Sequence, residues 1–455
     1  MINLTRREGF TLRIERILQE ESQHSLDLYL YVPGDLELTK HVVSEEDFYH
    51  SAIHVRRTYF STKNELPLVY RRLAGRGQIP SHQYRLNLSL YAYQYASALE
   101  NSIRAIRHGV DGQENVTLAQ AEQEIALIQS ILRRLRRNAP EEENVLKYFN
   151  NIDNYLSWFT EQQLLSLAAH MPRGNDYGAI KSRLLAVCSE ENRYRRASGY
   201  NSERAESSPT RMSNKMRLLR RLTEYPVTLN DKPKELGAGE QRIVKALATG
   251  LVMIVVTLAL MQARLLMNDF TVWFILTLSI VYALREVFKD ELRNTLWRWL
   301  RRGRPKWVRV YRDPDSQQIV GRQREWFDYR KPSRLNREIQ AARRGSISHR
   351  QEVVLQYKSR SRMRPTRFLS GYKQTRETIE LDLRLLTRLM SKTTHRVYAV
   401  KEGQVTREKV ERRYQLNLIS CSVQEGHPLD IQRWKIIISR SGIVDIEEVP
   451  IQAVE

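Results

Sequence analysis

The sequence predicts a membrane protein of the α+β class. A mostly helical N-terminal bundle with a small β element would precede a central two-helix transmembrane hairpin and a C-terminal antiparallel α+β domain. Three observations predict this fold: two long uncharged segments near the middle of the chain, helical periodicity before them and strand-like alternation after them. The 455 residues are enough for about two or three domains.

The first domain, residues 1–190, is predicted to be cytoplasmic and mostly helical. Residues 26–32 alternate between polar and apolar side chains before a turn, so we expect a small strand or hairpin. Ser44 begins a capping-box pattern, from which we expect a helix to continue to about Arg57. In residues 81–172 three segments repeat apolar side chains at helical spacing, and the short breaks between them favour an antiparallel bundle.

Residues 191–241 are predicted to be a flexible linker with a short basic helix. Between Asn192 and Asn214 the composition shifts to Ser, Arg, Asn and Glu, with almost no aliphatic side chains. The basic amphipathic segment Met212–Leu222 follows and is the expected helix.

Residues 242–288 are predicted to be the transmembrane hairpin. Ala246–Ala263 and Phe270–Leu284 contain no charged residue. As helices they would be about 27 Å and about 23 Å long, close to the roughly 30 Å hydrocarbon core of a bilayer. The short connection between them would return the chain to its starting side, so both termini would lie together.

The charges around the hairpin predict which side that is. Arg242 and Lys245 precede it and a run of basic residues from Arg285 follows it, whereas the connection carries Arg264 offset by Asp269. By the positive-inside rule both termini are expected to be cytoplasmic, in a multi-pass inner (plasma) membrane protein of a bacterial type.

Residues 289–312 are predicted to be a basic, tryptophan-bearing juxtamembrane segment. The formal net charge is +22, and most of the excess lies in residues 291–413. Each Lys or Arg near an anionic leaflet contributes about 1 kcal/mol, and tryptophan favours the membrane interface. We expect a helix along the headgroups until Gly303 and Pro305. The predicted lipid-binding residues are Arg298, Arg301, Arg302, Arg304, Lys306, Trp297, Trp299 and Trp307.

Residues 313–455 are predicted to be a cytoplasmic, basic α+β domain. Residues 380–390 fit a strand or a helix, and we favour a helix. The basic run 356–376 also suits nucleic-acid phosphates, although no helix-turn-helix, RNP, KH or zinc-finger pattern accompanies it. The strand-like runs are Val353–Tyr357, Arg396–Val400, Tyr414–Val423, Trp434–Ser439 and Ile443–Val449.

The sequence carries no catalytic signature, so no catalytic residue or cofactor is predicted and we lean against an enzyme. His50 and His54 have the spacing of metal ligands on the predicted helix. The interval lacks the glutamate of zinc-protease helices, and a solvent-exposed polar face explains the pair as well. Cys188 and Cys421 are expected to be small buried hydrophobic residues.

Taken together, these features predict a membrane-anchored scaffold or interaction protein. It would position its cytoplasmic modules at an anionic inner-membrane surface as a homo-oligomer, with an unknown protein partner. One alternative is an oligomeric channel or membrane-perturbing effector. The other is a membrane-tethered nucleic-acid-binding protein.

Overall fold

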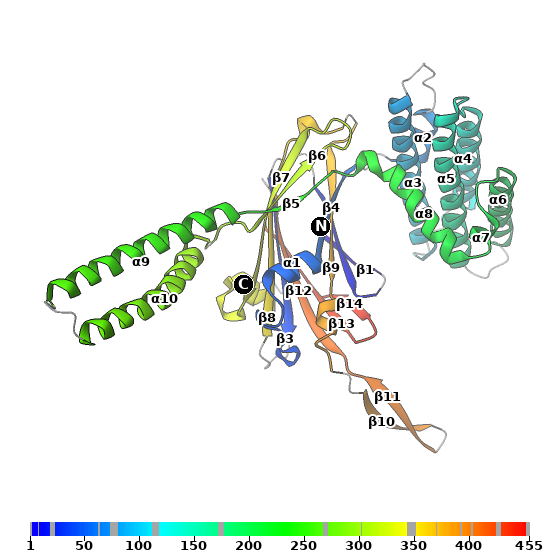
Figure 1. Cartoon of the computed structure of the whole chain (residues 1–455). Helices are drawn as coiled ribbons and strands as arrows, with labels where there is room; N and C mark the ends of the chain where they lie inside the picture. Colours follow the sequence, from blue (N-terminus) through cyan, green and yellow to red (C-terminus); the bar gives the residue numbers. More distant parts are fainter. Residues whose placement is uncertain are drawn as a thin grey trace.

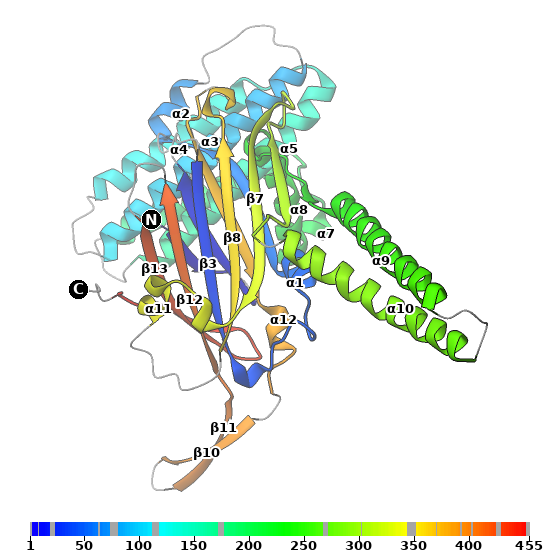
Figure 2. The same cartoon turned by 90° about the vertical axis from the view of Figure 1, so that its left-hand side faces the viewer.

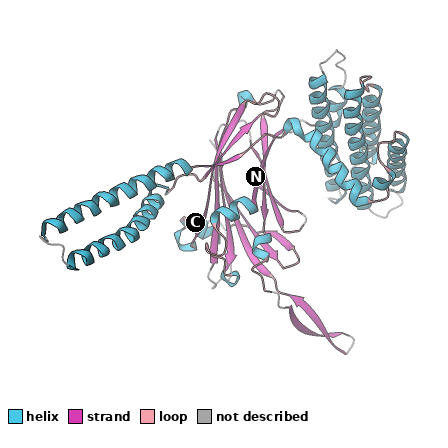
Figure 3. Cartoon of the chain, viewed as in Figure 1, coloured by secondary structure: helices cyan, strands magenta, loops and turns pink. Residues whose placement is uncertain are grey.

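The computed structural model describes residues 2–7, 9–18, 23–61, 64–72, 81–111, 118–171, 177–266, 272–301, 303–343, 352–369, 371–391, 394–401, 404–424 and 429–451. Its centre is a body of two β-sheets from which a helical bundle, a helical arm and a β-ribbon project (Figure 1). Figure 3 separates these parts by secondary structure.

The larger sheet of the body has eight strands in the order β14-β13-β12-β3-β8-β7-β6-β5. Neighbouring strands are antiparallel. The N-terminal strand β3 lies at its centre, between β12 and β8, so the two ends of the chain build one sheet. The strands are β3 (Gln23–Pro33), β5 (Pro233–Glu235), β6 (Trp307–Arg312), β7 (Ile319–Arg330), β8 (Glu352–Met363), β12 (Tyr414–Gln424), β13 (Asp430–Ile438) and β14 (Ile443–Glu448).

The smaller sheet has four antiparallel strands in the order β1-β2-β9-β4. These are β1 (Ile2–Arg6), β2 (Thr11–Leu18), β4 (Ile53–Phe60) and β9 (Gln374–Asp382). β10 (Thr394–Lys401) and β11 (Gln404–Glu411) form the separate projecting ribbon.

The two sheets pack face to face around the main hydrophobic core. Alternate residues of each strand point inward, so that Leu12 and Ile379 of the small sheet meet Leu28, Phe327 and Leu418 of the large one. Helix α1 (Glu45–Ala52) closes one side of this core with Phe48, whose ring stacks on Phe327 at 5.0 Å between centroids. As predicted, Ser44 caps α1, its hydroxyl accepting a hydrogen bond from the Asp47 amide at 3.0 Å.

The helical bundle is inserted between β4 and β5. It has its own apolar core, in which Tyr95 of α3 packs with Ile128 of α4 and Leu156 of α5. The predicted bundle in residues 81–172 is therefore present, and the segment expected as a linker adds further helix to it. Its helices are α2 (Leu66–Arg72), α3 (Ser81–Asp111), α4 (Leu118–Arg137), α5 (Glu143–His170), α6 (Gly178–Ala197), α7 (Glu203–Glu206) and α8 (Pro209–Glu224).

The arm is inserted between β5 and β6 and consists of α9 (Ala238–Leu266) and α10 (Val272–Arg301), which run antiparallel. Figure 1 shows the arm and the bundle on opposite sides of the β body, with the eight-stranded sheet on the side of the arm, and Figure 2 shows the arm extending past the β7 side of that sheet. The short helix α11 (Arg337–Arg343) covers part of this outer face, and the small helix α12 (Arg384–Thr387) follows β9.

The predicted fold class is wrong. The protein is a mixed helix-and-sheet structure with large antiparallel sheets, and only one helix among the described residues, Gly239–Gln262 in α9, is long and apolar enough to cross a membrane. The first eighteen residues of α10 already include Arg285, Glu286 and Lys289. Charged side chains within a bilayer are costly, and three of them in the last five of these eighteen positions leave α10 without an apolar stretch of spanning length among the described residues, so a two-helix transmembrane hairpin and a multi-pass topology are not supported.

Candidate functional site: a basic sheet face beside an apolar arm

Four arginines form a compact array on the outer face of the eight-stranded sheet. In the register of β7 and β8, Arg322 lies opposite Arg362 and Arg324 lies opposite Arg360. Side chains in such cross-strand pairs are about 5 Å apart at Cβ, and like charges directly opposite each other destabilise a sheet. We call Arg322, Arg324, Arg360 and Arg362 the arginine face.

All four side chains are exposed, and none has an acidic partner within the described part of the chain. They line an open groove of about 1210 Å³ whose other charged residues are also arginines. The remaining arginines of this groove are Arg312, Arg364 and Arg367. The arrangement therefore concentrates positive charge that no described side chain neutralises.

The interior beneath the arginine face is polar but neutralised. Arg57 of β4 is fully buried and donates hydrogen bonds to Gln323 at 3.2 Å and to Ser361 at 3.3 Å. Glu377 accepts from Arg57 at 2.9 Å and from Arg16 at 2.5 Å. Burial alone would raise the pKa of Glu377, but the two guanidinium groups outweigh burial and lower it to about 2. Arg57 and Arg16 beneath the arginine face are thus paired with an acid, whereas the four arginines of that face are not.

The arm presents apolar side chains to its surroundings in nearly every direction. α9 buries Ala248, Val252 and Val256, whereas Leu247 and Ile254 are 68% and 63% exposed. A soluble helix keeps a polar stripe, so an apolar surface on this scale indicates a partner that is itself apolar. The support for membrane association is limited to this one helix, which has the length and composition of a membrane span.

The predicted juxtamembrane helix is interrupted in the structure. α10 ends at Arg301 and the chain resumes as the strand β6 at Trp307. The alternation of Trp307, Arg309 and Tyr311 sends these side chains into the body, where Trp307 is 2% exposed and stacks on Tyr49 at 3.7 Å. Trp307 is thus a core residue and cannot contact lipid in this fold.

The other predicted lipid contacts lie around the root of the arm. Lys306 is largely buried and donates hydrogen bonds to Glu45 at 2.5 Å and Asp328 at 2.9 Å. Arg301 and Arg304 make exposed ion pairs with Glu235 and Glu240 at the start of the arm.

Of the remaining predicted contacts, Trp297 is partly buried, and the Arg301 guanidinium lies over its ring, whereas Trp299 is 72% exposed. Arg298 lies on α10, but its side chain is outside the described set, as is all of Arg302.

The histidine pair is not brought together on one helix. α1 ends at Ala52, so His50 lies on the helix and His54 lies on β4, in register with Glu380. Both are exposed, and no group of three metal-ligating side chains occurs in the described parts of the chain. The β-branched and aromatic residues after Ala52 favour a strand, which explains why the predicted helix to Arg57 stops early.

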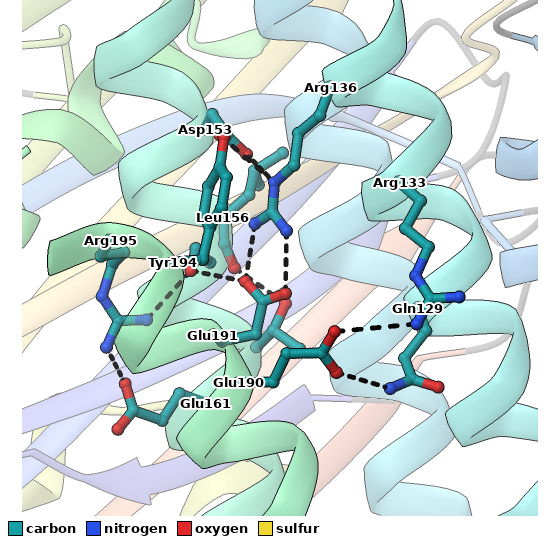
Figure 4. Close-up of polar contacts among 12 residues, drawn as sticks. Gln129, Arg133, Arg136, Asp153, Leu156, Glu161, Glu190, Glu191, Tyr194 and Arg195 are labelled. Carbon is teal, nitrogen blue, oxygen red and sulfur yellow. Dashed lines mark hydrogen bonds and ion pairs between the residues drawn. The ribbon is translucent and has the colours of Figure 1, made fainter. Parts of the chain in front are cut away.

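The bundle contains a second charged cluster, which is internally satisfied (Figure 4). Arg136 of α4 donates two hydrogen bonds to Glu191 of α6, at 3.0 and 2.6 Å, and another to Asp153 of α5 at 3.2 Å. Arg195 pairs with Glu161 in the same layer. Because each charge shown has a partner, we assign the cluster the role of fixing the three helices in register.

The sequence pointed to half of the arginine face, because Arg360 and Arg362 lie in the basic run 356–376, whereas Arg322 and Arg324 were not singled out although a signal was present. In Gly321–Trp326 and Ser359–Met363 arginine recurs at every second position, which is the period that places side chains on one face of a strand. The pairing of these two runs across β7 and β8 is a property of the fold. Comparisons with protein-family models, curated proteins and solved structures found no match for this chain.

Proposed function

We propose that this protein is a membrane-associated scaffold that holds its helical bundle at an anionic membrane surface, the cytoplasmic face of an inner membrane. The observation that carries the proposal is the position of the unneutralised arginine face on the same side of the body as the apolar arm, away from the bundle. In this arrangement α9 contacts lipid, the arginine face meets phosphate headgroups and the bundle faces the aqueous phase.

The energetics favour a lipid surface as the partner of this face. Each arginine held near an anionic leaflet contributes about 1 kcal/mol, so the array contributes about 4 kcal/mol at low salt. This gain outweighs the few tenths of a kcal/mol that each like-charged pair costs the sheet. Because the arginines are exposed, salt should weaken the interaction over a Debye length of about 8 Å. Homo-oligomerisation is part of the proposal and can be measured by light scattering in detergent.

The test uses the full chain in nanodiscs, with a fluorophore on a cysteine that replaces Gln23. Gln23 is exposed, lies opposite Arg362 on β3 and borders the arginine face. With a headgroup-linked quencher we expect strong quenching in discs that contain phosphatidylglycerol, less in pure phosphatidylcholine and less again at high salt. A label at Arg133 of the bundle should not be quenched. Equal quenching at the two positions would refute docking through this face.

A matched pair of charge variants separates the site from the net charge. Replacing all four residues of the arginine face with glutamine should abolish the phosphatidylglycerol-dependent quenching. The control variant replaces four exposed bundle arginines and loses the same charge, so it should behave like the wild type. Its positions are Arg104, Arg133, Arg183 and Arg196.

A second candidate function is nucleic-acid binding by the same face. The observation that favours it is the spacing of the arginines, about 7 Å apart along each strand, with Trp326 following on β7. A linear polyanion would then bind with a steep salt dependence. A short single-stranded DNA that binds the wild type more tightly than vesicles do, and loses that binding in the arginine-face variant, would replace the lipid proposal.

A further inference from the structure

A second groove lies where the arm joins the body. It is lined by the end of α10, the segment before β6, the outer face of β7 and β8, and the turn after β3, and its volume is about 1550 Å³. We call it the arm-root groove. Basic side chains outnumber acidic ones along it, and three aromatic rings, Trp297, Trp326 and Tyr329, line it as well.

The floor of the arm-root groove is electrically balanced. Glu45 accepts hydrogen bonds from Lys306 at 2.5 Å and from the Tyr329 amide at 3.2 Å, and it also pairs with Lys40. Burial raises the pKa of Glu45, but the hydrogen bonds from the two lysines outweigh it, so the carboxyl pKa lies below its usual range. Asp328 takes another hydrogen bond from Lys306 at 2.9 Å. These lysines are committed to protein partners.

The rim of the groove is not balanced. Lys331, Arg334 and Arg360 are exposed there and have no acidic partner within the described residues. The turn that carries the first two is well defined, because the Gln340 amide donates to the carbonyls of Pro332 and Leu335 at 3.3 and 2.9 Å. The cations are therefore held on a structured turn beside an open volume.

The aromatic wall joins this rim to the arm. The Trp326 indole donates to the carbonyl of Gly303 at 3.1 Å, which holds the ring against the segment that leaves α10. Trp297 packs at the start of α9, where Gly237 has a φ of +98° and a Cβ would lie 3.1 Å from the Trp297 ring. Tryptophan and basic residues beside an apolar helix are typical of the headgroup level of a membrane.

We propose that the arm-root groove binds the headgroup of an anionic phospholipid that carries two phosphate groups. The inference rests on the proposed membrane-surface function and adds a ligand class to it. The groove is larger than the roughly 300–1000 Å³ of a typical small-molecule pocket, which leaves room for two phosphates. Lys331 and Arg334 bind one phosphate and Arg360 the other, while the aromatic rings carry the glycerol and the start of the acyl chains.

The test is native mass spectrometry of the full chain in detergent, titrated with cardiolipin as the two-phosphate probe and phosphatidylglycerol as the one-phosphate probe. Each rim cation is expected to contribute roughly a fivefold gain in affinity, so the K331Q/R334Q variant should bind cardiolipin about thirtyfold more weakly than the wild type. Its affinity for phosphatidylglycerol should change less. The R133Q/R183Q variant loses the same charge on the bundle, outside both this groove and the arginine face, and should keep the preference for cardiolipin.

A wild type that binds the two lipids equally would overturn the proposal, as would a groove variant that keeps the preference. Inorganic pyrophosphate separates the two sources of diphosphate. If it displaces cardiolipin at similar concentration, the groove takes a soluble diphosphate ligand, and if it does not, the lipid is the ligand. This binding is measured without vesicles, so it does not depend on docking to nanodiscs. Loss of the cardiolipin preference with intact docking would refute only the groove, whereas loss of docking with an intact preference would refute only the membrane-surface function.

Discussion

Replacing Glu377 with glutamine should strongly destabilise the β body. Glu377 is fully buried in β9 and neutralises Arg57 and Arg16, which are themselves buried. Breaking a buried pair by removing one partner costs about 3–5 kcal/mol, because the remaining charge is left in a low-dielectric interior. The pKa gives a similar value: the difference between about 2 and the ordinary 4.5 corresponds to about 3 kcal/mol.

The sign of the pH dependence follows from the lowered pKa. The ionised carboxylate stabilises the folded state above the unfolded pKa of about 4.5, and this contribution is lost as the pH falls toward 2. The E377Q variant should therefore be less stable than the wild type at pH 7, and the difference should shrink in acid.

Hydrogen exchange in increasing urea is the suitable assay, because it reads the free energy of opening strand by strand and separates the body from the bundle. The matched control is Glu380→Gln, three positions along β9. Glu380 pairs with Arg7 and Arg13 at the surface, so its loss should cost less than about 1 kcal/mol. If E377Q and E380Q lower the opening free energy of β9 equally, the reasoning about the buried charges is incorrect.

Three further outcomes are expected elsewhere in the chain. Arg136→Met leaves two acidic partners unpaired in the bundle. The free energy of opening measured by hydrogen exchange should therefore fall by about 3–5 kcal/mol in α4–α6 and stay unchanged in the β body. Ser44→Ala removes the cap of α1 and should cost about 1 kcal/mol by urea denaturation. Burial raises the pKa of the Cys188 thiol to about 11 and that of Cys421 to about 12, so neither should react with iodoacetamide at pH 8 until the chain unfolds.

Local patterns predicted the elements whose packing is local. The apolar spacing in residues 81–172 corresponds to buried positions such as Leu99, Ile128 and Ile152 of the bundle. The alternating runs in the C-terminal part lie in strands, including Tyr414–Val423 within β12. In both cases the period of the side chains decides which face of the element each residue occupies.

Long-range pairing was not readable from the sequence. Residues 26–32 looked like a minor β element, yet β3 pairs with β8 and β12 across more than three hundred positions and forms the centre of the large sheet. Residues 380–390 were expected to be a helix, but β9 extends to Asp382 because Ile379 and Leu381 enter the core between the sheets, and only Arg384–Thr387 form a helix, α12. Such alternatives are decided by tertiary burial rather than by intrinsic propensity.

The same distinction explains why the sequence pointed to residues 298–306 rather than to the arginine face. The sequence prediction relied on the density of basic residues in 298–306. In the structure, Arg301, Arg304 and Lys306 form ion pairs with Glu235, Glu240 and Glu45 that hold them within the fold.

On β7 and β8 the arginines are no denser, yet the register sets them opposite one another without acids. A β body that neutralises Arg57 and Arg309 inside could equally have carried glutamate opposite Arg322 or Arg324 outside. Stability alone would favour that exchange, because opposite charges across strands stabilise and like charges do not. We therefore propose a polyanionic partner for the unpaired array, and its position beside the exposed apolar helix α9 favours a membrane surface as that partner.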